Sequence, residues 1–97
     1  MNALEEIKEK INEHESFLKD RFKVKSIGIF GSYLRGEQDD KSDIDILVEF
    51  SDTIDLFEFI RLENFLSEIL DRKVDLVMKD TLKPRIKERI LEDAVYI

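Results

Sequence analysis

The stretch GSYLRGEQDDKSDIDILVEF, from Gly31 to Phe50, holds the features that decide the fold. A Gly-Ser turn ends one apolar segment, and two aspartates, Asp43 and Asp45, enter the next segment at alternate positions. Alternate residues of a β-strand point to the same face, with Cα atoms roughly 6.6–6.8 Å apart. Two carboxylates on one face, beside a glycine turn able to receive phosphate, are the parts of a metal–nucleotide site. The stretch therefore favours an enzyme of phosphoryl or nucleotidyl transfer.

Hydrophobic periodicity on either side of this stretch predicts alternating helices and strands. We expect helices over residues 3 to about 20, 55–70 and 82–92, with Pro84 in the first turn of the last one. Short β-branched segments predict strands at Val24–Phe30, Ile44–Phe50 and 73–78, and residues 32–36 suit a short helix. Residues 95–97 fit either a final strand or a loosely packed end.

This order of elements predicts an α/β or α+β domain, in which helices pack on a small sheet. About a dozen residues join the first two strands, so both a mixed and a wholly parallel sheet remain open. With 97 residues, we expect one domain that spans residues 1–97. A core of this size leaves little room for an enclosed cavity, which favours an open groove that a partner completes.

Composition excludes several classes of function. The net charge of −7 and the pI of about 4.7 argue against binding nucleic acid over a broad surface, because Lys and Arg supply most of that affinity. Cysteine is absent, which rules out disulfides and thiolate metal sites. The charged N-terminal segment has no apolar run typical of a signal peptide or a membrane span, so we expect a cytoplasmic protein.

A third carboxylate, Asp75, lies on the strand predicted at 73–78. If this strand pairs with Ile44–Phe50 in the matching register, Asp75 joins Asp43 and Asp45. Magnesium suits such a cluster, because it binds through one or two carboxylates, keeps waters and accepts substrate phosphates. One or two ions are compatible with the pattern. The alternative is that all three aspartates are solvated residues of strand edges and turns.

Glycine and hydroxyl groups next to the acidic strand suit phosphate. Gly31 permits close backbone approach, and Ser32 offers a hydroxyl and an N–H at the start of the short helix. Arg35 suits either a phosphate contact or a loop cap. Gly28 is interpreted as a point of tight packing rather than a functional residue.

The combined motif resembles the DNA polymerase β-like nucleotidyltransferase superfamily. The residues that carry the resemblance are Gly31-Ser32, Asp43-Ile44-Asp45 after ten intervening residues, and Asp75 on a later strand. More closely, GSYLRG followed by SDIDILV is similar to the minimal nucleotidyltransferases, the antitoxins of HEPN/MNT toxin–antitoxin pairs. The resemblance covers nearly the whole chain.

The resemblance implies a mixed sheet with helices on one side, ATP as nucleotide donor, and a set of functional residues. Gly31 and Ser32 would hold the triphosphate, with Arg35 on the nucleotide side. Asp43 and Asp45 would ligate magnesium, and Asp75 would complete the acidic set and help deprotonate the acceptor hydroxyl.

For the resembled antitoxins, the acceptor is a tyrosine hydroxyl of a cognate HEPN ribonuclease toxin, which AMP transfer silences. Membrane association is not expected, and a homo- or hetero-oligomer is compatible with the sequence. Two other functions remain open. One is a binding module that neutralises its toxin by occlusion through an apolar face around Phe57 and Phe59. The other is a nucleotidyltransferase for a small molecule.

Overall fold

The computed structural model describes residues 3–30 and 43–97. Its elements are, in chain order, α1 (Ala3–Glu13), α2 (Glu15–Phe22), β1 (Val24–Phe30), β2 (Ile44–Phe50), α4 (Leu56–Leu70), β3 (Val74–Met78), a 3-10 turn η1 (Lys79–Thr81), α5 (Pro84–Asp93) and β4 (Val95–Tyr96). Among the residues described, no helix is long and apolar enough to span a membrane.

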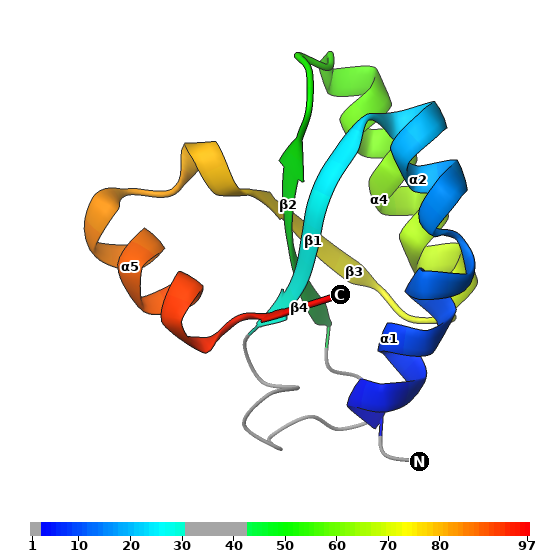
Figure 1. Ribbon diagram of the computed structural model, residues 1–97, viewed down its shortest axis with the longest axis horizontal. Helices are drawn as coiled ribbons and strands as arrows, with labels where there is room; N and C mark the ends of the chain where they lie inside the picture. The colour runs from blue at the N-terminus through cyan, green and yellow to red at the C-terminus, as the bar shows by residue number, and fades with distance from the viewer. Residues whose placement is uncertain (1–2, 31–42) are drawn as a thin grey trace.

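The four strands form one mixed sheet in the order β3-β2-β1-β4 (Figure 1). Strand β1 runs antiparallel to both β2 and β4, whereas β2 and β3 run parallel. Parallel neighbours need a crossover connection, and α4 supplies it between β2 and β3. The fold class predicted from the sequence is therefore confirmed, and the sheet is the mixed alternative.

Helices α1, α2 and α4 lie together on one side of the sheet (Figure 1). Their apolar faces meet the inward side chains of the strands, and this contact forms the core. Its most completely buried members are Ile11, Leu18, Ile29, Ile44, Ile46, Val48, Leu62 and Leu66. These residues recur at helical spacing in the helices and at alternate positions in β2, which is why the periodicity of the sequence predicted the elements.

One further helix, α5, lies on the other side of the sheet, which differs from the expectation of helices on one side only. Helix α5 connects η1, beside β3 at one edge of the sheet, to β4 at the other edge, and Figure 1 shows it on the side away from α1, α2 and α4. Leu47 shares a face of β2 with Asp45 and Glu49, yet it is only 1% exposed. The face that carries the aspartates is therefore acidic at one end and apolar at its middle.

The long N-terminal helix expected to reach about residue 20 is two helices that meet at His14. His14 has φ −109° and ψ 15°, outside the helical region, and its ring Nδ1 lies 2.9 Å from the carbonyl oxygen of Lys10. The ring also meets Phe65 edge-on, with the ring centroids 5.5 Å apart. Side-chain competition for a helical carbonyl interrupts the helix here, and the apolar spacing of the sequence does not reveal it.

The crossover helix α4 is anchored at both ends. Asp55 is its N-cap and accepts a hydrogen bond from the Glu58 N–H at 2.8 Å, while Asp71 ends it with φ 52°. Arg21 of α2 donates to Glu58 at 2.5 Å, and the rings of Phe22 and Phe65 lie 5.9 Å apart. These contacts fix α4 against α2 and therefore fix the place where β3 begins.

Candidate active site

The register of the sheet brings the predicted acidic residues together at the end of the sheet where β2 and β3 begin. This end is called the acidic edge. Asp45 of β2 is paired with Phe30, the last residue of β1, on one side and with Asp75 of β3 on the other. The N–H of Ile44 donates to the carbonyl oxygen of Lys73 at 2.9 Å, which fixes the parallel alignment at its first residue. The matching register, which the sequence left as a condition for the cluster, is therefore present.

Register partners on adjacent strands point their side chains to the same face, so Asp45 and Asp75 are side-by-side neighbours. Asp43 precedes β2 by one residue and shares the alternation of Asp45. Asp45 is half-buried, whereas the side chains of Asp43 and Asp75 are exposed. The three carboxylates form an open, water-accessible acidic edge rather than a closed pocket.

Repulsion at this edge is modest. Two unit charges about 5 Å apart repel by roughly 3 kcal/mol at an effective dielectric of 20, but by less than about 1 kcal/mol in bulk water. Because Asp75 is exposed, the cost of holding it beside Asp45 lies nearer the lower value. Electrostatic repulsion alone therefore does not require a cation, and the case for one rests on the chemistry of the ligands.

Among the described residues, the three aspartates do not form a complete metal-binding set. Within residues 3–30 and 43–97, no three His, Cys, Asp or Glu side chains are arranged to hold a metal ion. The pair formed by Asp45 and Asp75, with Asp43 at the strand entrance, still fits magnesium, which needs only one or two carboxylates together with waters and substrate phosphates. The donor set contains oxygen alone, which is the preference of this ion.

A lysine that the sequence reasoning did not assign to the site lies at the same edge. The Nζ atom of Lys73 is 4.0 Å from Oδ2 of Asp43, with the two side chains 81% and 44% exposed. Such an exposed pair contributes little to stability. Its position matters, because it places a cation next to the carboxylates. The sequence does contain a signal for this lysine, because Lys73 directly precedes the strand that carries Asp75.

The predicted phosphate-binding residues Gly31, Ser32 and Arg35, and the short helix expected at 32–36, lie outside the described residues. Phe30 ends β1 next to Asp45, so the chain enters this segment at the acidic edge. Gly28, in contrast, is described. A Cβ atom there would lie 3.3 Å from both Cδ1 of Tyr96 and the carbonyl oxygen of Val95, which confirms its interpretation as a point of tight packing.

Comparison with known proteins identifies the family to which this fold and its acidic edge belong. Residues 11–97 match the nucleotidyltransferase domain, so the chain belongs to this family and is a nucleotidyltransferase. The match includes every element from the end of α1 to β4.

Individual relatives are similar over the whole chain. The protein adenylyltransferase MntA of Thermococcus cleftensis is 46% identical over 97 residues, covering 100% of this chain and 98% of that protein. A relative from Methanocaldococcus jannaschii, likewise grouped by name with the protein adenylyltransferases, is 53% identical over 98 residues and 100% of both chains.

Solved structures agree with the fold. A structure described as a minimal nucleotidyltransferase superimposes with a TM-score of 0.79 and 32% identity, over 98% of this chain and 95% of that chain. A toxin–antitoxin crystal structure with AMP-PNP gives a TM-score of 0.72 and 32% identity over 88% and 69% of the two chains. A third structure, of a tri-AMPylated Shewanella oneidensis HEPN toxin in complex with MNT antitoxin, gives 0.67 and 27% over 93% and 70%.

Proposed function

We propose that this chain is an antitoxin that transfers AMP from ATP to a tyrosine hydroxyl of a HEPN-domain toxin and thereby silences it. The observation that carries the proposal is the pairing of Asp45 with Asp75 at the edge where the chain leaves β1 toward Gly31 and Ser32. Support comes from relatives named protein adenylyltransferase and from the AMPylated HEPN toxin in a similar complex. The proposed setting is the cytoplasm.

In the proposed reaction, an acceptor hydroxyl attacks the α-phosphate of ATP in line with the leaving group. The new bond joins the acceptor oxygen to the α-phosphorus, the bond from that phosphorus to the β-phosphate oxygen breaks, and pyrophosphate leaves. Asp75, which is exposed at the acidic edge, would accept the proton of the hydroxyl. Positioning and charge neutralisation supply most of the rate enhancement in such transfers.

The remaining site residues would bind the metal ion and the nucleotide. Asp43 and Asp45 would hold Mg²⁺, with Asp75 beside them as the third carboxylate. When bound, this ion would neutralise charge on the phosphates. Gly31 and Ser32 would receive the triphosphate through backbone N–H groups and the hydroxyl, with Arg35 beside it. Lys73, next to Asp43, would then be free to contact a phosphate oxygen.

The test is a transfer assay with ATP labelled at the α-phosphate, magnesium, and the protein encoded next to this chain. We expect label on a tyrosine of that protein, and loss of transfer on the order of 100-fold or more for Asp45→Asn. Asp80→Asn is the matched control, because Asp80 is an exposed carboxylate beyond the opposite end of β3. Equal labelling by Asp45→Asn, or label that never reaches the protein, would contradict the proposal.

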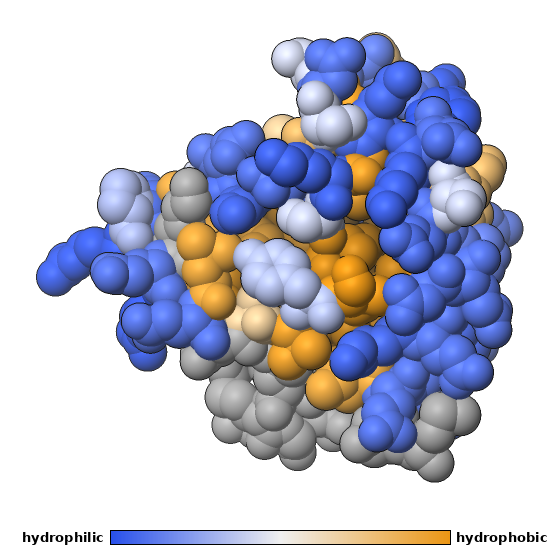
Figure 2. All heavy atoms as spheres, in the orientation of Figure 1, coloured by the Kyte–Doolittle hydropathy of each residue, from blue (hydrophilic) through white to orange (hydrophobic). Residues whose placement is uncertain are grey.

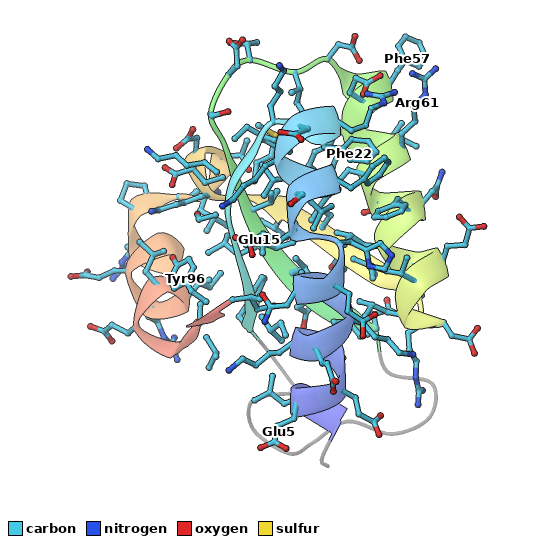
Figure 3. The ribbon with its side chains drawn as sticks, turned by 45° about the vertical axis from the view of Figure 1, so that its right-hand side comes forward. Glu5, Glu15, Phe22, Phe57, Arg61 and Tyr96 are labelled. Atoms are coloured by element: carbon cyan, nitrogen blue, oxygen red, sulfur yellow. The ribbon has the colours of Figure 1, made fainter. Side chains whose placement is uncertain are left out.

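One observation favours neutralisation by occlusion as a second candidate. Phe57 is 73% exposed and Leu56 69% exposed at the start of α4, so this part of the predicted apolar face is available (Figure 3). Phe59 is not part of it, since its ring packs 6.5 Å from that of Phe50. Occlusion requires that a chain with both Asp43→Ala and Asp45→Ala still neutralises the toxin. Nucleotide transfer to a small molecule would instead proceed without any protein acceptor.

A further inference from the structure

Two neighbouring rows of side chains on the aspartate face of the sheet differ in character. A row here means the residues that the register pairs across the strands. The acidic row consists of Phe30, Asp45 and Asp75. The next row on the same face, called the uncharged row, consists of Tyr96, Gly28, Leu47 and Val77. The two rows are adjacent because alternate residues of a strand share a face.

The ring of Tyr96 lies over Gly28 on this face. Its Cδ1 and Cε1 atoms are 3.3 Å and 3.5 Å from the place where a Cβ atom of Gly28 would stand. That Cβ atom would point to the same side as Leu47, the register partner of Gly28. The next residue ties the end of β4 to β1, since the Ile97 N–H donates to the carbonyl oxygen of Ile27 at 2.9 Å. The missing side chain of Gly28 thus lets an aromatic ring reach across β1.

Tyr96 is the accessible end of the uncharged row. It is 43% exposed, whereas Leu47 is 1% exposed. Within the described part of the chain, its hydroxyl makes no hydrogen bond and no other aromatic ring packs on its own. Figure 3 shows Tyr96 on the side of the sheet where α5 lies, and Figure 2 shows an apolar surface patch near the C-terminus, between α5 and the two N-terminal helices. An aromatic ring is therefore available to a ligand on the face that carries the aspartates.

The distance between this ring and the acidic edge suits a nucleotide. Gly28, under the ring, is one strand across and one alternate residue along from Asp45. With strands about 4.8 Å apart and alternate residues about 6.8 Å apart, their Cα atoms are roughly 8 Å apart. The sugar of a nucleotide separates its α-phosphate from its base by a comparable distance. Phe30 borders the path on the same face and is half-buried, so the path is lined by an apolar side chain rather than by a charge.

The proposed reaction leaves this direction to the nucleoside. Asp75 stands on the β3 side of Asp45 and is proposed to serve the acceptor, while β1 on the other side leads to Gly31 and Ser32, proposed for the rest of the triphosphate. In-line attack places the acceptor and the leaving pyrophosphate on opposite sides of the α-phosphorus. The nucleoside must then extend across that line, and over the sheet it meets the uncharged row.

We infer that Tyr96 binds the base of the nucleotide by stacking, which makes its end of the uncharged row a nucleobase subsite. The inference rests on the proposed function for the place of the phosphates. The ring carries the contact, and the hydroxyl is not required. Stacking accepts any base, because every base has a π-face, and a larger base overlaps the ring more. The subsite therefore favours purine over pyrimidine nucleotides.

The test measures binding by calorimetry, with the ATP analogue AMP-PNP and with inorganic tripolyphosphate, each in the presence of magnesium. We expect Tyr96→Leu to raise the Kd of AMP-PNP at least about fivefold and to reduce the preference for AMP-PNP over CTP. The Kd of tripolyphosphate should stay unchanged, since this ligand has no base. Tyr96→Phe keeps the ring and should bind AMP-PNP as the wild type does.

A second control addresses the hollow of about 180 Å³ between β1 and the helices α1 and α2, which Tyr96 also borders. Asn12 is an exposed residue of its lining. Asn12→Ala should bind AMP-PNP as the wild type does, because the inferred subsite lies on the aspartate face.

Tyrosine fluorescence gives a readout that does not depend on the stability of the Leu variant. The chain has two tyrosines and no tryptophan, so Tyr96 is the sole tyrosine of a Tyr33→Phe variant. We expect AMP-PNP to quench its emission and tripolyphosphate to leave it unchanged. Equal emission with both ligands overturns the inference.

The outcomes separate the nucleobase subsite from the proposed transfer reaction. Unchanged AMP-PNP binding in Tyr96→Leu, an equal loss for tripolyphosphate, or a loss in Asn12→Ala overturns the subsite, even if label still reaches the toxin. A base-dependent loss in Tyr96→Leu upholds the subsite, even if the wild type transfers no label and the transfer is thereby contradicted. A Tyr96→Leu variant that binds AMP-PNP normally but has a raised KM for the protein acceptor assigns the ring to the acceptor and also overturns the inference.

Discussion

At the scale of single residues, Gly28 is a point of tight packing in the sheet. Its absent side chain lets the ring of Tyr96 and the backbone of Val95 approach β1. Both contacts belong to β4, a strand of only two residues at the end of the described chain. A methyl group at position 28 therefore acts first on the attachment of β4 and only secondarily on the core.

For Gly28→Ala we expect a local effect. The added methyl group crowds a backbone oxygen, which overpacks the strand, while alanine also reduces the entropy of the unfolded chain. Because these effects oppose each other, global stability should change by no more than about 1 kcal/mol. The amide of Ile97, which bonds to Ile27, should exchange about fivefold faster, which corresponds to about 1 kcal/mol of local opening. Native exchange of Ile97 together with a loss of global stability well above this value would contradict the interpretation.

Single residues also show how far the sequence alone predicts the fold and the candidate site. The bounds of β1 and β2 were predicted from short β-branched runs. The pairing of Asp45 with Asp75 was left as a condition, because alternation within a strand does not set the register between strands. The interruption at His14 was missed, since it depends on one side chain bonding a helical carbonyl. Leu47 alternates with Asp45 and Glu49, so the sequence pattern alone does not reveal that it is buried. The roles of Gly31, Ser32 and Arg35 remain predictions.

At the scale of elements, the α2–α4 contact positions the crossover that leads to β3 and Asp75. Its polar part is Glu58, which accepts hydrogen bonds from Arg21 at 2.5 Å and from Arg61 at 2.7 Å. The Arg21 hydrogen bond, followed by other charge interactions with Arg21 and Arg61, holds the pKa of Glu58 below its ordinary value of 4.5. The contact therefore links the packing of these helices to pH.

A depressed carboxylate pKa stabilises the fold above the unfolded-state pKa, and this contribution disappears as pH falls through the folded-state pKa. We expect Glu58→Gln to lower the urea midpoint at pH 7, and the difference from the wild type to vanish as pH falls below about 4.5. Glu68→Gln, an exposed glutamate of the same helix, should show little difference at either pH. A Glu58→Gln difference that is unchanged down to pH 3 would exclude the ion pair as its cause.

At the scale of the whole molecule, net charge and exposed apolar surface oppose each other. The chain carries a charge of −7, and copies of it repel one another at low salt. At the start of α4, however, Leu56, Phe57 and Ile60 are 69%, 73% and 43% exposed, and Figure 3 shows Phe57 pointing away from the protein. Exposed apolar side chains gathered in this way favour contact with another surface.

Charge repulsion and apolar attraction between copies of the chain respond differently to salt, which gives the last prediction. The Debye length falls from about 10 Å at 0.1 M salt to about 3 Å at 1 M, so added salt screens the repulsion and leaves the apolar attraction. We expect weak self-association that grows with NaCl in sedimentation velocity experiments. Phe57→Ser should weaken it at least about fivefold, because burial of a Phe side chain contributes roughly 1.5–3 kcal/mol. Phe57→Leu keeps the apolar surface and should retain most of the association. Because Phe57 is largely exposed, both variants should unfold within about 0.5 kcal/mol of the wild type, so a difference in association cannot arise from misfolding.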